Sequence, residues 1–547
     1  MADKTEIQAI IDGMSAAQKA GQFFLLAYPG KDPKVIQPLL EQYGLCGCYI
    51  SQDNADTFAE AENFTAEIQA MSMKFQNLPL LLGVDQEGAW GVLIPESHPG
   101  PGNLALGAVR DTGLVSGMYR ALGEEMLSVG YNCLLGPCAD VNSDPRSPII
   151  GTRSFGEFPE RVAACVDTAV KGALLTGTVT TVKHFPGHGA TEGDTHRVIP
   201  EVNKSLDELR KTDLLPFLAG IKAGVHIVMT SHIRYPQVDK DHPATLSKTI
   251  LQDLLRMEMG FRGIILSDSM NMGAIRKFYD PAESTLLALK AGVDVVMLAE
   301  EHYDHSGEYL PKQIASIEIV KKAIESGVLS AEEVNEKLHR ILDLKLNRMK
   351  VRGPALTAPQ KQAIAGAEEK AARAAFVLIQ KNLWPLPAEG SIVCINANPR
   401  ESYKNIVNPR GIGPNQEKPA FDTFRESFGA IEKNALFVDY EDVKEKTAEI
   451  EKAAALVVVT EDYPLPGEDF DKEKQQALAA DLCRQYGAKT VILGLRSSYE
   501  LSNYPETVTY LCAYSSRTCS AKEAAKILAA REKSPEGMGN PPVSVRI

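Results

Sequence analysis

The sequence lacks an apolar run long enough to cross a membrane. A transmembrane helix needs about 20 consecutive apolar residues, and no segment of the 547-residue chain approaches that length. The first residues, Met-Ala-Asp-Lys-Thr-Glu, are charged and are not followed by the apolar core of a secretory signal peptide. We therefore expect a cytoplasmic protein that has no membrane partner.

Excess positive charge and paired cysteines are missing as well. The net charge of -13 disfavours binding to nucleic acid. The nine cysteines are scattered, and neither Cys46/Cys48 nor Cys133/Cys138 has the spacing of zinc ligands. An odd number of cysteines without a signal peptide indicates reduced thiols.

What the sequence does contain is a regular alternation of strand-like and helix-like segments. Short apolar segments alternate with amphipathic helical patterns throughout residues 1–350, which is typical of a parallel sheet covered by helices. Eight such units favour a closed (β/α)8 barrel as the catalytic domain. The alternative, a doubly wound sheet, would require a glycine-rich turn after its first strand. Residues 27–30 read Ala-Tyr-Pro-Gly, which does not fit such a turn. The strands are expected at residues 22–27, 47–51, 78–85, 132–140, 178–184, 226–232, 263–268 and 294–298, and the helices at 3–19, 33–43, 55–74, 113–129, 159–176, 205–223, 248–257 and 281–291.

A second, smaller α/β region follows. Residues 351–384 are predicted to form a linker and a helix, because 351–359 are rich in proline and glycine. Residues 385–547 alternate again and predict an α/β sandwich domain. Its strands are expected at residues 391–396, 435–438, 455–460, 490–494 and 508–513.

Ionisable residues gather where the strands of the first region end. The strand 178–184 ends in Lys183-His184 and continues into a glycine-rich loop that carries Asp194 and His196. Active sites of parallel barrels are built at these carboxyl ends. An aspartate at such a position can also cap a helix, but five neighbouring strand ends together favour one polar pocket. The other ends and their loops contribute Asp85, Asp140, Arg153, His232, Asp268 and Met270.

Two kinds of chemistry can use this set of residues. In a metal-dependent hydrolase, His184, His232 and Asp268 would be the ligands. Such a barrel draws a His-x-His pair from its first strand, whereas residues 23–27 read Phe-Phe-Leu-Leu-Ala, and Lys183 would have no role. The second chemistry is glycosyl transfer to water.

Glycosyl transfer needs a carboxylate on one face of the sugar and a proton donor for the leaving oxygen. Asp268 supplies a carboxylate at a strand end. Asp194 and His196 are two residues apart, so in an extended segment their side chains face the same way. An aspartate that orients an imidazole makes an acid/base pair. Asp85, Arg153, Lys183 and His184 would then hold the sugar hydroxyls.

The residues from Lys183 to His196, Lys-His-Phe-Pro-Gly-His-Gly followed by Asp-Thr-His, resemble the signature of glycoside hydrolase family 3 in its β-N-acetylglucosaminidase branch. Resemblance covers most of residues 15–345, and more loosely the C-terminal region, which is similar to the second domain of two-domain members. Further matching segments are Asp-Gln-Glu-Gly at 85–88, Gly-Pro-Cys-Ala-Asp-Val at 136–141, Ile-Gly-Thr-Arg-Ser-Phe-Gly at 150–156 and Leu-Ser-Asp-Ser-Met at 266–270.

The resemblance implies a retaining, two-step hydrolysis of terminal β-linked N-acetylglucosamine. Asp268 matches the nucleophile, and His196 paired with Asp194 matches the acid/base. No metal or cofactor is implied. The expected substrates are bacterial cell-wall fragments of the kind that are recycled in the cytoplasm, and the expected state is a monomer or a homodimer. The substrate-binding residues are expected to be Asp85, Arg153, Lys183, His184, His232, Trp90 and Met270.

One departure from the branch affects the substrate. After residues 85–88 the branch continues with Gly-Arg-Val, whereas this chain has Ala89-Trp90-Gly91-Val92. Trp90 either fills core space or stacks on a sugar face, so the sequence leaves the identity of the leaving group undecided.

Three other activities stay open. A β-glucosidase of the same family would take its acid from the second domain, where Glu461, Glu468 and Glu500 are available. A phosphorylase is compatible with a neutral histidine acid, which does not repel an incoming phosphate. A non-catalytic sugar-binding protein is the alternative of another class.

Overall fold

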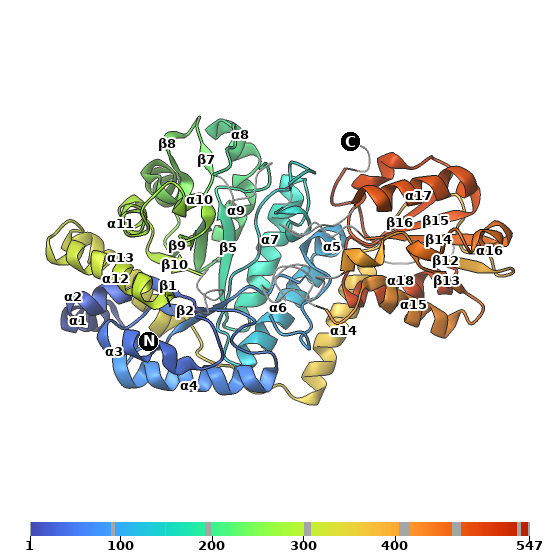
Figure 1. The fold of residues 1–547 in the computed structure, drawn as a ribbon. Helices are drawn as coiled ribbons and strands as arrows, with labels where there is room; N and C mark the ends of the chain where they lie inside the picture. The colour runs from blue at the N-terminus through green and yellow to red at the C-terminus, as the bar shows by residue number, and fades with distance from the viewer. Residues whose placement is uncertain are drawn as a thin grey trace.

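The computed structural model describes residues 2–88, 93–147, 149–191, 199–299, 308–403, 416–461, 472–532 and 538–544. Several residues named above lie outside these ranges, namely residues 89–92 with Trp90, Asp194, His196 and Glu468. Two large sheets, each covered by helices, follow one another along the chain (Figure 1).

The first sheet is a closed, parallel, eight-stranded barrel in the order β1-β10-β9-β6-β5-β4-β3-β2. The pairing of Phe24 with Val296 closes it. Each strand overlaps a predicted one, which confirms the (β/α)8 barrel. Strands β3, β5, β6 and β10 are buried along their whole length, as expected for strands covered on both faces. The strands are β1 (Phe24–Leu26), β2 (Gly47–Ile50), β3 (Leu81–Val84), β4 (Cys133–Leu134), β5 (Val179–Phe185), β6 (Ile227–Thr230), β9 (Ile264–Ser269) and β10 (Val295–Leu298).

The barrel helices follow the predicted pattern with two corrections. The single helix expected at 3–19 is two helices, because Ser15 and Gln18 form a capping box that starts a new one. The helix expected at 205–223 divides at Thr212, whose backbone leaves the helical region. A short hairpin of β7 (Arg234–Tyr235) and β8 (Asp239–Pro243) was not predicted. The helices are α1 (Lys4–Gly13), α2 (Ala16–Gly21), α3 (Gln37–Gln42), α4 (Phe58–Gln76), α5 (Asn103–Ala108), α6 (Gly113–Ser128), α7 (Pro159–Leu174), α8 (Leu206–Lys211), α9 (Leu214–Ala223), a π-helical segment (Thr249–Glu258), α10 (Gly273–Arg276), α11 (Pro281–Ala291), α12 (Tyr309–Glu325) and α13 (Ala331–Asp343).

Helix α14 (Ala358–Ala374) leads into a six-stranded sheet of order β11-β16-β15-β14-β12-β13. Five of its strands overlap predicted ones: β12 (Ile392–Asn396), β13 (Leu436–Val438), β14 (Ala455–Thr460), β15 (Thr490–Gly494) and β16 (Thr509–Cys512). The sixth, β11 (Val377–Gln380), pairs antiparallel with β16 and was missed. It lies in the segment expected to be linker and helix, so the second sheet begins before residue 385.

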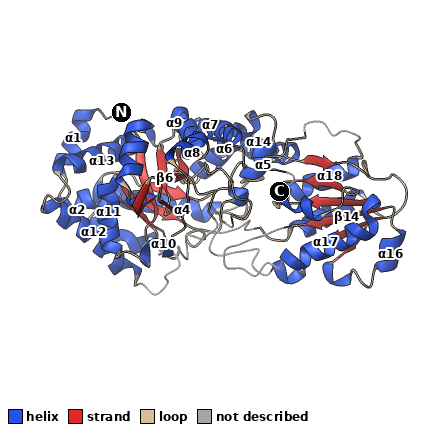
Figure 2. Ribbon diagram, turned by 90° about the horizontal axis from the view of Figure 1, so that it is seen from above, coloured by secondary structure: helices blue, strands red, loops and turns tan. Residues whose placement is uncertain are grey.

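Helices cover both faces of this sheet, which confirms the α/β sandwich (Figure 2). Along β12, Ile392 and Cys394 pack in one apolar cluster with α15 (Ala420–Ile431) and α18 (Thr518–Ala530). The alternate residues Val393 and Ile395 belong to the other cluster, with residues of α16 (Thr447–Lys452) and α17 (Lys472–Tyr486). This alternation is the two-residue period of a strand.

The C-terminal segment returns to the barrel. Asn540 N–H donates to the carbonyl of Ala108 at 2.8 Å, and Glu157 N–H donates to the carbonyl of Pro542 at 3.0 Å. Gly156 lies against Pro542 with φ +136°, and a Cβ there would lie 2.2 Å from the Pro542 oxygen. Among the residues that the structure describes, no helix is both long and apolar enough to span a bilayer.

Candidate active site

Lys183, at the end of β5, joins two carboxylates that follow β3. Its Nζ lies 2.6 Å from Asp85 Oδ1 and 2.5 Å from Glu87 Oε1. Tyr49, from β2, donates its hydroxyl to Asp85 Oδ2 at 3.0 Å. Lys183 and Glu87 are buried, whereas the Asp85 side chain is 30% exposed. Asp85 is therefore the member of this cluster that a ligand can reach.

Glu87 also binds Arg153 through two parallel hydrogen bonds. Arg153 Nε and Nη2 lie 2.9 and 3.0 Å from the two carboxylate oxygens. Burial alone would raise the pKa of Glu87, but the charges of Arg153 and Lys183 hold it well below its usual range. Burial would likewise lower the pKa of Lys183, but Asp85 and Glu87 raise it above its usual value. The site thus contains fixed charges of both signs. Glu87 was quoted above only as part of a motif; its position two residues after Asp85 at a strand end was the available signal.

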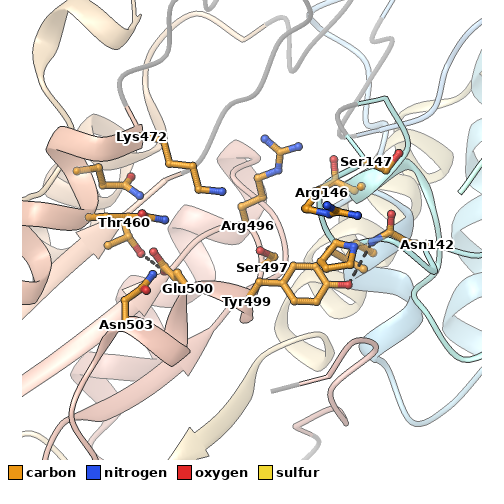
Figure 3. Close-up of a pocket in the computed structure, with 16 residues that line it drawn as sticks. Asn142, Arg146, Ser147, Thr460, Lys472, Arg496, Ser497, Tyr499, Glu500 and Asn503 are labelled. Atoms are coloured by element: carbon orange, nitrogen blue, oxygen red, sulfur yellow. Dashed lines mark hydrogen bonds between the residues drawn. The ribbon is translucent and has the colours of Figure 1, made fainter. Parts of the chain in front are cut away.

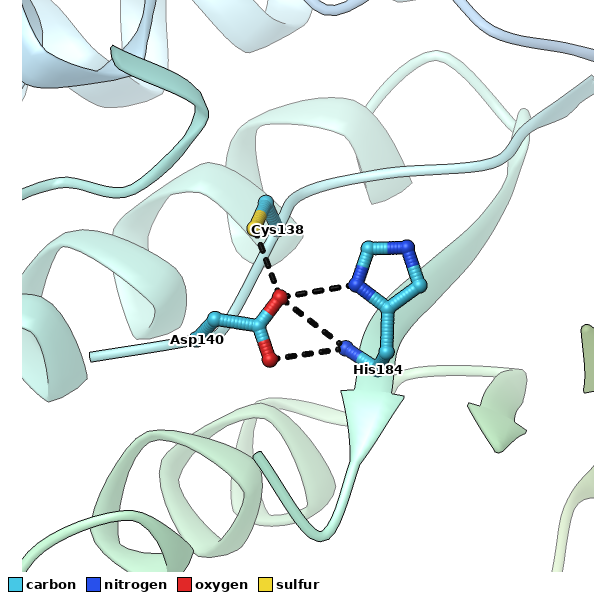
Figure 4. A group of neighbouring side chains, drawn as sticks. All are labelled: Cys138, Asp140 and His184. Carbon is cyan, nitrogen blue, oxygen red and sulfur yellow. Dashed lines mark hydrogen bonds and ion pairs between the residues drawn. The ribbon is translucent and has the colours of Figure 1, made fainter. Parts of the chain in front are cut away.

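His184 is held by Asp140, which the sequence placed at a strand end without a role (Figure 4). His184 Nδ1 lies 2.8 Å from Asp140 Oδ2, and the backbone N–H of His184 also donates to this carboxylate, at 3.1 Å. His188 N–H donates to it at 2.7 Å. On the other side of the ring, Nε2 lies 3.4 Å from Arg153 Nη2. The ring of His184 is thus held between the Asp140 carboxylate and the Arg153 guanidinium.

Cys138, Asp140 and His184 are also near enough to one another to bind a metal, with ligand atoms within 4.8 Å. Asp140, however, already accepts hydrogen bonds from the ring and backbone of His184, the backbone of His188 and the thiol of Cys138. Burial, followed by the charge of Asp140, raises the pKa of the Cys138 thiol well above its usual value. A protonated thiol is a poor ligand, so the cluster fits a hydrogen-bonded support for His184. Within the described ranges no other such group occurs, and His232 and Asp268 do not belong to this one.

Asp268 lies at the end of β9, partly buried. The backbone N–H of Ser269 donates to Asp268 Oδ1 at 2.7 Å. Burial alone would raise the pKa of this carboxyl, but the charges of His184, His232 and Lys183 and the Ser269 hydrogen bond lower it below its usual value. Asp268 is therefore an ionised carboxylate beside the Lys183 and His184 cluster.

His232 and Met270 support the strand ends. His232 Nε2 lies 2.9 Å from the carbonyl oxygen of Ser269, and its Nδ1 lies 2.9 Å from Thr245 Oγ1. Met270 is 1% exposed and its N–H donates to the carbonyl of Met297 on β10. These contacts indicate that both residues help to hold Asp268; a direct contact with substrate stays a prediction.

The loop that carries Asp194 and His196 begins beside this cluster. Asp144 N–H donates to the carbonyl of Gly189 at 3.0 Å, and a Cβ at Gly189 would lie 1.7 Å from the carbonyl oxygen of Val141. The start of the loop is thus anchored next to the segment that holds Asp140. Asp194, His196 and Trp90 themselves lie outside the described residues, and their roles stay predictions.

The glutamates considered for a β-glucosidase belong to the second domain. Glu461 is fully buried, near the hydroxyl of Tyr403. Glu500 accepts hydrogen bonds from Tyr504 at 3.0 Å and from Tyr510 at 2.9 Å. Glu468 lies outside the described residues.

Comparisons with known proteins identify relatives of the barrel and of the whole chain. Residues 15–344 match the family described as the glycosyl hydrolase family 3 N-terminal domain. Beta-hexosaminidase A of Pseudoalteromonas piscicida is 31% identical over 335 residues, which cover 57% of this chain and 55% of that protein. The match therefore spans little more than half the length of that relative.

Two further comparisons are consistent with the family match of residues 15–344. The beta-hexosaminidase of Pseudomonas aeruginosa (strain LESB58) is 34% identical over 260 residues, which cover 47% of this chain and 75% of that protein. The structure of a glycoside hydrolase family 3 β-N-acetylglucosaminidase from Paenibacillus sp. str. FPU-7 has a TM-score of 0.83 at 25% identity. The match covers 98% of this chain and 99% of that chain, so it includes both regions of the fold.

Proposed function

The chain belongs to glycosyl hydrolase family 3, and from this premise we propose that it is a retaining exo-β-N-acetylglucosaminidase. The observation that carries the proposal is the position of Asp268 at the carboxyl end of β9, where His184, His232 and Lys183 favour its ionised form. The names of the β-hexosaminidase relatives and of the full-length structural neighbour support the sugar.

Asp268 is the proposed nucleophile. The Ser269 N–H fixes one carboxylate oxygen, and the other oxygen is the one that we propose attacks the anomeric carbon. Attack forms a bond from this oxygen to the sugar while the bond to the leaving oxygen breaks. A carboxylate with a lowered pKa stays ionised, and therefore nucleophilic, at neutral and mildly acidic pH.

The residues proposed to bind the terminal sugar are Asp85, Lys183, Arg153 and His184. Asp85 offers partly exposed oxygens to hydroxyl donors, while the buried Lys183 and Arg153 hold the carboxylates in place. Charge-assisted hydrogen bonds of this kind are about twice as strong as neutral ones. Because the charges are paired before substrate arrives, little reorganisation is needed in the transition state.

Asp194 and His196 are the proposed acid/base pair. In the first step the imidazole gives its proton to the leaving oxygen; in the second it takes a proton from the water that attacks the glycosyl-enzyme. The Asp-x-His spacing supports this assignment, and so does the anchoring of the preceding Gly189 beside the site.

We further propose cell-wall fragments as substrates, a cytoplasmic location and a monomeric or homodimeric enzyme. The resemblance of residues 183–196 to the branch signature supports these assignments. The proposed domains are a catalytic barrel at 1–350, a linker and helix at 351–384 and an α/β sandwich at 385–547, with β11 contributed from the connecting segment.

The test compares nitrophenol release from the β-N-acetylglucosaminide and the β-glucoside, each with and without phosphate. We expect preference for the acetylated sugar, no effect of phosphate, and a loss of about 10³-fold or more in Asp268→Asn. Asp167→Asn, which changes a partly exposed carboxylate on α7, is the control and should keep full activity. Sugar 1-phosphate as product would make the enzyme a phosphorylase, and unchanged turnover in Asp268→Asn would overturn the assignment of the nucleophile.

A further inference from the structure

The hairpin of β7 and β8, which is labelled in Figure 1, contacts both ends of one loop. The loop leaves β5 and carries Asp194 and His196, the proposed acid/base pair. The structure describes the start of this loop, residues 186–191, and its end, residues 199–203. The contacts at these two ends determine where the loop leaves the barrel and where it returns.

The end of the loop pairs with the backbone of Arg234 in β7. The N–H of Arg234 donates to the carbonyl oxygen of Pro200 at 3.0 Å, and the N–H of Val202 donates to the carbonyl oxygen of Arg234 at 2.9 Å. The two bonds form a parallel bridge between Arg234 and Glu201. Because this pairing involves only main-chain atoms, it places the end of the loop beside β7.

The start of the loop binds the side chain of Tyr235, the other residue of β7. The hydroxyl of Tyr235 donates to the carbonyl oxygen of Gly187. Tyr235 is fully buried, and burial raises the pKa of its hydroxyl well above the usual value, an effect to which the charge of Asp213 adds. The hydroxyl therefore keeps its proton and remains a donor. Two consecutive residues of one strand thus bind the two ends of the loop.

Gly187 fits closely at this contact. A Cβ at Gly187 would lie 2.8 Å from the Cβ of Asp213, and the φ of Gly187 is +138°. Both observations favour glycine at this position. Asp213 is 1% exposed and binds Lys204, which directly follows the end of the loop, at 2.6 Å. The start and the end of the loop are therefore linked through Asp213 as well as through the hairpin.

The segment that leads into the hairpin also supports the proposed nucleophile. His232, two residues before Arg234, lies with its ring Nε2 2.9 Å from the carbonyl oxygen of Ser269. The N–H of Ser269 in turn binds the carboxylate of Asp268. Supports of both proposed catalytic groups therefore lie within four consecutive residues, and a retaining mechanism needs a fixed separation between those groups.

We propose that Tyr235 is a positioning residue for the loop that carries the acid/base. Its hydrogen bond to Gly187 holds the start of the loop, while the backbone of Arg234 holds the end. Together they set the place of His196 relative to the nucleophile, and neither hairpin residue needs to touch the sugar. This inference rests on the proposed function, since it takes His196 as the acid/base, and it assigns a role to a hairpin that the sequence did not predict.

The experiment measures kcat/KM for the phenyl and the dinitrophenyl β-N-acetylglucosaminides. In a retaining enzyme kcat/KM reports the first step, in which the acid protonates the leaving oxygen. Phenolate is a poor leaving group that needs this proton, whereas dinitrophenolate leaves as a stable anion. We expect Tyr235→Phe to lose about tenfold or more on the phenyl glycoside and to stay within about twofold of the wild type on the dinitrophenyl glycoside.

Tyr43→Phe is the matched control. Tyr43 is 1% exposed, its hydroxyl binds Glu318 Oε1 at 2.7 Å, and it lies before β2, at the end of the barrel opposite the site. Both of its kcat/KM values should stay within about twofold of the wild type. Gly187→Ala displaces the same contact from the side of the loop and should reproduce the pattern of Tyr235→Phe. Its result decides the question if Tyr235→Phe does not fold.

His196→Ala tests the premise separately. It should show the same dependence on the leaving group, with a loss of about 10²-fold or more on the phenyl glycoside. If His196→Ala loses activity equally on both substrates, His196 is not the acid, and the inference fails together with that part of the proposed function. If His196→Ala shows the dependence but Tyr235→Phe and Gly187→Ala do not, the proposed function stands and Tyr235 does not position the loop.

Discussion

Asp140 holds His184 by the ring and by the backbone at the same time. One carboxylate accepts from Nδ1 at 2.8 Å and from the backbone N–H at 3.1 Å. The same carboxylate accepts from His188 N–H at 2.7 Å, at the start of the loop that leads to His196. A single side chain that does not need to touch the sugar thus fixes two segments of the proposed site.

Asp140→Asn should reduce kcat/KM by roughly 10²-fold, because small displacements of positioning residues are costly in catalysis. An amide has only one acceptor oxygen. Its NH2 group would face N–H donors that hydrogen-bond to the Asp140 carboxylate in the wild type. Steady-state kinetics on the N-acetylglucosaminide measures the effect, and Asp167→Asn serves as the control. A fully active Asp140→Asn enzyme would show that His184 needs no such support.

Glu87→Gln should lower the free energy of unfolding by about 3–5 kcal/mol, because it leaves Arg153 and Lys183 buried without their shared partner. Urea denaturation at neutral pH measures this. The exposed Glu60→Gln, which removes a partner of Lys31, should cost less than about 1 kcal/mol. A loss as small as that of the control would contradict the structural role of Glu87.

Glu87 should also make the free energy of unfolding depend on pH. The pKa of Glu87 in the folded protein lies below its usual value of 4.5. Its contribution to stability is therefore present above pH 4.5 and is lost as the pH falls below that value. We expect the difference in unfolding free energy between the wild type and Glu87→Gln to narrow on acidification below 4.5. If the difference in unfolding free energy between the two proteins stays constant down to the lowest pH measured, Glu87 is not held in its ionised form.

Asp294→Asn separates stability from catalysis. Asp294 is fully buried and binds Arg256 at 2.5 Å and Arg340 at 2.9 Å, directly before β10 and so at the barrel end opposite the site. The substitution should cost about 3–5 kcal/mol of unfolding free energy, while kcat of the folded enzyme stays within about twofold. Asp343→Asn, at a partly exposed pair, is the stability control. A large loss of kcat with little change in stability would reverse this assignment.

Gly189→Ala should disrupt the start of the Asp194–His196 loop. Its Cβ would lie 1.7 Å from the carbonyl oxygen of Val141, which is backbone and has little freedom to move. We expect a loss of activity of about 10²-fold or more, measured on the same glycoside. Gly366→Ala, inside α14 with nothing within 4 Å of a new Cβ, should keep activity and stabilise the protein by up to about 1 kcal/mol. Equal activity in the two variants would show that the loop tolerates displacement.

The eight barrel strands can be predicted from the sequence, because a buried parallel strand is a continuous apolar run and each run is local. The sequence also predicts that Asp85, Lys183, His184 and Asp268 lie at the same mouth, because each of them ends an apolar run of a parallel barrel. The resemblance of residues 183–196 to one family added the proposed roles.

Which of these charged residues contact one another could not be predicted from the sequence. Glu87 reads as one more polar residue of a turn until Arg153, 66 residues later, and Lys183 are seen on its two oxygens. Strand β11 was missed because its pairing with β16 joins segments more than 120 residues apart. A cavity that is lined by Asn142 of the barrel and Arg496 of the second domain (Figure 3) is likewise formed by segments far apart in the sequence. A local sequence pattern indicates which face of a strand or helix a side chain occupies. It does not indicate which residue pairs with a buried charge or with the edge of a strand, because those partners are distant in the sequence.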